Sequence, residues 1–155
     1  MQQIDVDLQQ IFLESASEVL ETMFFTGIES EAGSDLPVPQ VSAELVFRGV
    51  QSGKFGVQVP LETGQQIAAN FLGADEVTSP QVDEVLCELC NMLCGSVLSR
   101  LEAGARFELL HPEVDPNNLS WHNRLDAVGY TFGLDEGAIT LWMVLDEPGV
   151  GVPAV

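Results

Sequence analysis

The stretch that most constrains the fold is residues 79–101, which read SPQVDEVLCELCNMLCGSVLSRL and predict one long helix that is apolar almost all the way round. At about 100° per residue, a narrow polar edge nevertheless runs along it through Glu84, Glu88, Asn91 and Gly95. An exposed helix edge needs polar residues, but it does not need a carboxylate and a carboxamide one turn apart. This pattern predicts that Glu88 and Asn91 face an external partner.

The same edge has a simpler interpretation as the solvated side of a core helix. Glu84 and Glu102 are typical of such a surface. Gly95 is not, because glycine costs about 1 kcal/mol in a helix interior relative to alanine. Its presence favours a close approach at this point, either by a partner molecule or by the neighbouring sheet.

Composition limits the classes of function. With 155 residues, 46% of them hydrophobic and only 19% charged, the chain is long and apolar enough for one folded domain. The net charge of −19, with only five Lys and Arg residues, argues against binding to nucleic acid or to an anionic membrane surface. The N-terminus has neither the basic region nor the apolar run of a signal peptide, so we expect a cytoplasmic protein.

Three cysteines lie close together in the long helix, at Cys87, Cys90 and Cys94. An odd number on one helix does not predict a disulfide framework. Redox pairs usually stand at a helix N-terminus, and a zinc site needs four ligands, which the chain does not group together. We interpret the three cysteines as small apolar packing residues and expect no metal site.

Hydrophobic periodicity predicts helices and strands along the rest of the chain. Asp7 is expected to cap a first helix, Thr63 to cap a short one through a Thr63-x2-Gln66 capping box, and Ser79 to cap the long one. Period-2 alternation predicts strands, and runs rich in Gly, Pro, Ser and acid predict loops. The expected elements are helices 7–26, 64–72 and 79–101, strands 41–48, 54–59, 105–110, 128–134 and 139–145, and irregular segments 29–40 and 111–126.

This order predicts an α+β fold, an antiparallel or mixed sheet with two long helices packed on one face. We expect one domain over residues 1–147 and a flexible C-terminal tail over 148–155. No internal repeat is visible at the level of residues.

Glu88-Leu89-Cys90-Asn91 followed by Gly95 resembles the Glu-x2-Asn helix of the CheC/CheX/FliY chemotaxis phosphatases. Its context is similar as well: a first helix ending in ETMFF, a hairpin FRGVQSGKFGVQVP and a short helix IAANFLG. The first helix carries Glu18-x2-Glu21 where CheC-like members have a second Glu-x2-Asn, so the resemblance is to the single-site CheX type. Glu84 departs from the Asp or Ser that the family often has four residues before the glutamate.

The resemblance implies a phosphatase that acts on the aspartyl phosphate of a CheY-type response regulator. Asn91 would orient the attacking water, and Glu88 would pair with a lysine beside the partner's phosphorylation site. Glu84 and Gly95 would contact the partner. The magnesium ion would belong to the regulator, so no cofactor of its own is expected, and the CheX type implies a homodimer.

Two other functions remain open at the level of the sequence. The chain could keep the fold and bind a regulator without hydrolysis. It could also be a dimerisation domain in which Glu-x2-Asn has no role.

Overall fold

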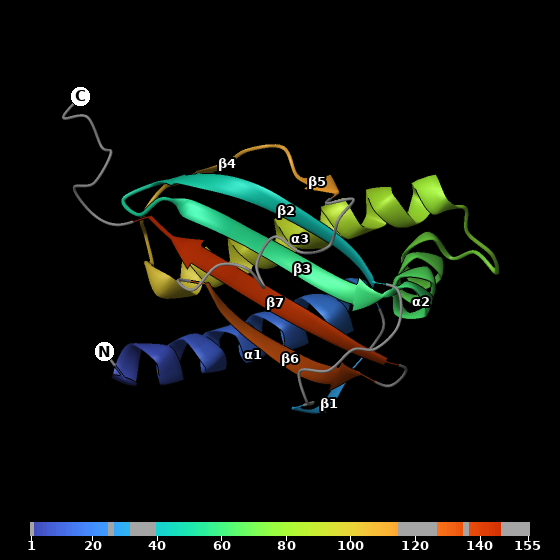
Figure 1. Ribbon diagram of the computed structural model, residues 1–155, viewed down its shortest axis with the longest axis horizontal. Helices are drawn as coiled ribbons and strands as arrows, with labels where there is room; N and C mark the ends of the chain where they lie inside the picture. The colour runs from blue at the N-terminus through green and yellow to red at the C-terminus, as the bar shows by residue number, and fades with distance from the viewer. Residues whose placement is uncertain (1, 25–26, 32–39, 115–126, 135–136, 147–155) are drawn as a thin grey trace.

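The computed structural model describes residues 2–24, 27–31, 40–114, 127–134 and 137–146. It is an α+β fold, as the sequence predicts, in which a 7-stranded sheet is covered on one face by the two long helices (Figure 1). The helices are α1 (Gln2–Met23), α2 (Leu61–Leu72) and α3 (Ser79–Leu101), and the strands are β1 (Ile28–Glu31), β2 (Gln40–Gly49), β3 (Gly53–Pro60), β4 (Phe107–Leu109), β5 (Glu113–Val114), β6 (Val128–Leu134) and β7 (Gly137–Leu145).

All strand pairs are antiparallel, in the order β1-β6-β7-β3-β2-β4, and β5 also pairs with β2. The first half of the chain supplies α1, β1 and the hairpin β2–β3, and the second supplies α3, β4 and the hairpin β6–β7. The short strand of each half pairs with the hairpin of the other half: β1 pairs with β6, and β4 pairs with β2. The structure thus contains a repeated arrangement that the sequence does not reveal.

The core lies between the sheet and the two long helices. Alternate residues of the central strands, among them Leu45, Phe55 and Leu141, face the helices and are almost completely buried. Phe12 of α1 makes edge-to-face contacts with Phe55 and Tyr130, at ring-centroid distances of 5.9 and 5.6 Å. Burial of each large side chain contributes about 1.5–3 kcal/mol, so this face fixes both helices on the sheet.

Trp142 lies on the opposite face of the sheet, as the alternation in its strand predicts, and is only 2% exposed. It packs against Gly56 of the neighbouring strand, with which it is paired. A Cβ at Gly56 would lie 2.1 Å from the indole ring, so only glycine leaves room for the tryptophan.

Several predicted boundaries are wrong for local reasons. α1 begins at Gln2 rather than at Asp7. α2 begins directly after β3, with Pro60 at the N-cap, so Thr63 lies inside the helix and is buried instead of capping it. Thr78, not Ser79, caps α3 through a capping box with Gln81, in which the Thr78 N–H donates to Gln81 Oε1 at 2.8 Å.

Two short strands were missed because each has too few residues for an alternation to show. β1 (Ile28–Glu31) overlaps the start of the predicted loop 29–40, and β5 lies within the predicted irregular segment 111–126. The tail 148–155 and the end of the predicted domain lie outside the described residues. No helix among the described residues is long and apolar enough to cross a membrane.

Candidate functional site

The long helix α3 is held by contacts on almost every side. It crosses the helix-facing side of β2 and β3, packs beside α1, and meets α2 near its start. The Cys90 thiol lies 3.6 Å from the Ala43 carbonyl oxygen and 3.8 Å from that of Phe55, which places this turn directly on the hairpin. Its buried residues are Val82, Val85, Leu86, Leu89, Cys90, Leu93, Cys94, Val97 and Leu98.

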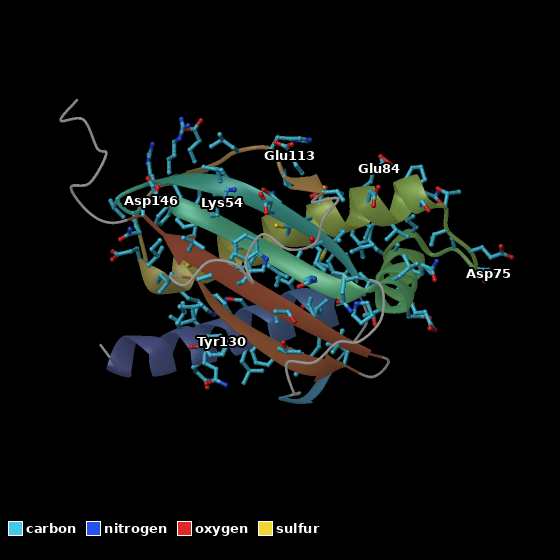
Figure 2. The ribbon with its side chains drawn as sticks, viewed as in Figure 1. Lys54, Asp75, Glu84, Glu113, Tyr130 and Asp146 are labelled. Atoms are coloured by element: carbon cyan, nitrogen blue, oxygen red, sulfur yellow. The ribbon has the colours of Figure 1, made fainter. Side chains whose placement is uncertain are left out.

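The polar edge predicted from the sequence is the side of α3 that these contacts leave free. Glu84 and Glu88 are exposed, and Asn91 and Gly95 are half-buried. Figure 2 shows Glu84 on the outer side of α3, with Glu113 on the nearby strand β5. Within the part of the chain that the structure describes, no side chain forms a hydrogen bond or ion pair with Glu88 or Asn91.

Gly95 faces open space. A Cβ built on it has no heavy atom within 4 Å among the described residues. Of the two interpretations that the sequence left open, close approach of the sheet is therefore excluded. Nothing within the described fold requires glycine here.

A groove runs beside the polar edge, with a volume of about 740 Å³. One wall is α3, through Asp83, Glu84, Cys87, Glu88 and Asn91, and the other is the segment Leu109, Leu110, His111 and Pro112 between β4 and β5. This second wall was not predicted from the sequence. Its signal in the sequence was Pro112, three residues after the short strand β4, because proline marks a sheet edge or a bulge.

The three cysteines behave as packing residues, as expected, although to different degrees. Cys90 and Cys94 are buried, and burial raises the pKa of both thiols. Cys87 is half-buried on the groove, and its pKa is raised by burial first and then by the carboxylates of Asp83, Glu113 and Glu88. Thiols with raised pKa values stay protonated at neutral pH, so none of the three is an activated nucleophile.

The corresponding position on α1 is chemically different. Glu18 precedes two buried residues, as Glu88 does. Unlike Glu88, it forms an ion pair with Arg100 Nη2 at 3.2 Å and accepts a hydrogen bond from Ser96 Oγ at 3.4 Å. Glu21 accepts a hydrogen bond from Ser17 Oγ at 3.2 Å. These carboxylates are engaged within the fold, whereas those on α3 remain available.

No set of three or more His, Cys, Asp or Glu side chains among the described residues is placed to hold a metal ion. Two functional groups therefore define the site, the Glu88 carboxylate and the Asn91 carboxamide, one helical turn apart beside a groove. The carboxamide can donate and accept hydrogen bonds at once.

The model of the family "Chemotaxis phosphatase CheX" matches residues 41–120, just over half of the chain. The chain belongs to the CheX chemotaxis phosphatase family. The matched segment contains α3 with both site residues and the whole second wall of the groove. No curated protein sequence matches the chain.

Solved structures show how widely this fold is shared. The CheX-CheY-BeF3-Mg complex from Borrelia burgdorferi matches with a TM-score of 0.72 at 23% identity, over 89% of this chain and 97% of that one. CheX from Vibrio vulnificus matches with a TM-score of 0.71 at 20% identity, over 90% and 96%. FliY from Thermotoga maritima matches with a TM-score of 0.62 at 17% identity, over 89% and 86%.

Proposed function

We propose that this protein dephosphorylates the aspartyl phosphate of a CheY-type response regulator. The observation that carries the proposal is the free pair Glu88 and Asn91 on the exposed edge of α3, in a chain of the CheX phosphatase family. A structural relative is solved with CheY, BeF3 and magnesium, which supports a receiver domain as the partner. The magnesium ion is proposed to reside on that partner.

Hydrolysis of an aspartyl phosphate needs few chemical groups from the phosphatase. An acyl phosphate is labile, so its hydrolysis needs a water held in line with the bond to the leaving carboxylate. The water oxygen bonds to phosphorus, the bond from phosphorus to the aspartyl oxygen breaks, and the water's protons leave with inorganic phosphate and solvent. Asn91 would orient this water, since a carboxamide holds it through both kinds of hydrogen bond without adding charge.

Glu88 would set the register of the complex. A carboxylate close to a phosphoryl group is repelled unless a cation lies between them. We propose that Glu88 pairs with a lysine beside the regulator's phosphorylation site. Glu84 would contact the partner further along the helix, and Gly95 would let the partner's surface come close.

We also propose that the protein works as a homodimer. At the two ends of the described strand order, β1 pairs only with β6, and β4 and β5 pair only with β2. Unpaired strand edges favour association with another chain. The resemblance of the sequence to the CheX type also implies a homodimer.

Two substitutions at Asn91 test the mechanism. Asn91→Ala should lower the saturated rate of receiver dephosphorylation about a hundredfold or more, as expected for loss of a group that acts in the transition state. Asn91→Asp keeps the shape but adds a negative charge beside the phosphate, so it should be equally inactive. Both should bind a beryllofluoride-loaded receiver, and both should unfold at nearly the temperature of the wild type because Asn91 is only half-buried and its side chain forms no hydrogen bond among the described residues.

Glu88→Ala should behave differently, with weaker binding as well as a lower rate, and its defect should shrink as salt is raised. Asn70→Ala on α2 is a control, because Asn70 lies on another helix, where its side chain accepts a hydrogen bond from the exposed Gln66. If the wild type does not accelerate loss of phosphate, or Asn91→Ala keeps the full saturated rate, hydrolysis from this site is refuted. Retained receiver binding in that case would favour the binding-module function.

A further inference from the structure

The groove beside the site exists because the edge of the sheet contains a bulge. Leu109 is paired with Phe47, and Glu113 is paired with Glu44. Between these pairs, two residues of β2 lie opposite three residues of the edge segment, Leu110, His111 and Pro112. The Leu110 N–H still donates to the Val46 carbonyl at 2.9 Å, but proline has no N–H to continue the ladder.

An extra residue bends the edge of a sheet and redirects its side chains. Here the bent segment forms the second wall of the groove, opposite the polar edge of α3. Leu109, Leu110 and Pro112 give this wall an apolar surface, and Cys87 adds an apolar patch from α3. The same groove contains Glu88 and Asn91, so whatever docks on the site lies over it.

The groove carries negative charge. Asp83, Glu84 and Glu88 line it, and among the residues that the structure describes no lysine or arginine does. Lys54 and Arg100 are paired elsewhere, with Glu44 at 3.2 Å and with Glu18 at 3.2 Å. The negative potential also reaches the Cys87 thiol, because Asp83, Glu113 and Glu88 each raise its pKa beyond the effect of burial.

Apolar walls with an acidic rim match one kind of side chain. Lysine and arginine have long apolar stems that pack on apolar surface while their charged ends stay among polar groups. We infer that this groove is a second docking site for the receiver domain, and that it takes a long basic side chain of the receiver distinct from the lysine that Glu88 meets. The inference rests on the proposed function, since the receiver is the occupant to which it commits.

The groove would thus choose between receivers, while Asn91 acts on any that dock. Its contribution should appear as affinity that depends on salt, because it combines charge attraction with packing. Asp83 is the best residue for testing this, as it lines the groove but is neither Glu88 nor Asn91.

The test compares two charge reversals, Asp83→Lys in the groove and Asp146→Lys outside it. Asp146 is exposed after the end of β7, at the other end of the molecule from Glu84 in Figure 2. Both variants change the net charge equally. The probe is the receiver domain of a CheY-type regulator loaded with beryllofluoride and magnesium, so that binding is measured without hydrolysis.

At low salt, Asp83→Lys should raise the Kd about tenfold or more, because it removes an attraction and adds a repulsion. At about 0.5 M salt, where charges are screened within a few ångströms, the variant should come within about threefold of wild type. Asp146→Lys should stay within about twofold of wild type at both salt concentrations. Equal effects of the two reversals would show that only net charge matters and would overturn the inference.

A second variant tests occupation of the groove independently of charge. Cys87→Trp fills the groove from α3, and it should raise the Kd about tenfold at both low and high salt if a side chain enters there. Its folding is checked by thermal unfolding, and Asp83→Lys keeps the inference testable if Cys87→Trp does not fold.

The outcomes separate this inference from the proposed function. If the wild type dephosphorylates the receiver but both groove variants bind it with the wild-type Kd, only the second docking site is refuted. If the variants change the mass of the protein in solution and leave the receiver Kd unchanged, the groove is an interface between copies of this chain, and the inference is again wrong. If the wild type has no activity towards the receiver, the proposed function fails first.

Discussion

Gly95→Ala should make the protein more stable and a poorer phosphatase at the same time. Gly95 lies in the interior of α3, where alanine is favoured over glycine by about 0.5–1 kcal/mol. The new methyl group would have no heavy atom within 4 Å among the described residues, so it neither clashes nor packs. The whole gain should therefore come from the reduced freedom of the unfolded chain.

For a domain of this size, 1 kcal/mol corresponds to about 2–4 °C in Tm. Thermal unfolding followed by circular dichroism should thus show an increase of about 1–4 °C for Gly95→Ala. Gly64→Ala is the matched control, since Gly64 is also helical but a Cβ there would lie 3.1 Å from Val41 Cγ2 and 3.3 Å from Val82 Cγ1. That crowding should cancel the gain, so the control should be no more stable than the wild type.

The functional half of the prediction concerns the partner. If the receiver's surface approaches Gly95 closely, an inserted methyl group costs about 1–3 kcal/mol of misfit. The Kd for a beryllofluoride-loaded receiver should then rise about tenfold, and Gly95→Gln, with a longer side chain of good helix propensity, should raise it further.

Two results would refute this reasoning in different ways. A lower Tm for Gly95→Ala would mean that the space around residue 95 is occupied. A wild-type Kd in both Gly95 variants, together with the expected gain in Tm, would mean that the partner does not reach this turn of α3.

The remaining predictions concern the cysteines and the assembly. Burial raises the pKa of Cys90 and Cys94 above the ordinary thiol value of 9.0, so the folded state keeps protons that the unfolded state loses in alkali. Stability should therefore be unaffected below that value and fall above it, by about 1.4 kcal/mol per thiol at pH 10. Urea unfolding from pH 7 to 10 should show this loss, and the loss in the variant Cys94→Ala should be smaller by about 1.4 kcal/mol; an equal loss in the variant would exclude the Cys94 thiol as a contributor. For assembly, light scattering should give about twice the chain mass of 16.8 kDa, and a monomer that persists as concentration rises would contradict the homodimer.

Much of this protein could be predicted from the sequence because the signals are local and repeated. The 3.6-residue and 2-residue periods of apolar residues placed the two long helices and the two hairpins, and through them the α+β class. The odd polar edge of α3 marked Glu88 and Asn91 as residues that face outward. In the structure Glu88 is exposed and Asn91 is half-buried on this edge, which agrees with the prediction because a helix that is apolar on every other side can leave only one edge in solvent.

Other features depend on residues that meet only in the folded chain. β1 and β5 are too short to show a period, and they are strands because β6 and β2 offer them partners. Thr63 had the spacing of a capping box, but Pro60 at the end of β3 starts the helix earlier and turns Thr63 inward.

The groove is the clearest case of a feature that tertiary structure alone decides. Its two walls come from α3 and from the segment after β4, and only the pairing of that segment with β2 brings them together. The ion pair between Arg100 of α3 and Glu18 of α1 also depends on tertiary structure, because it crosses the interface between the two helices. It engages the carboxylate of Glu18, whereas the carboxylates on the polar edge of α3 remain available. Sequence periodicity determined which residues face outward; the packing of distant segments decided which of those residues share a site, because a period along one element carries no information about its neighbours in space.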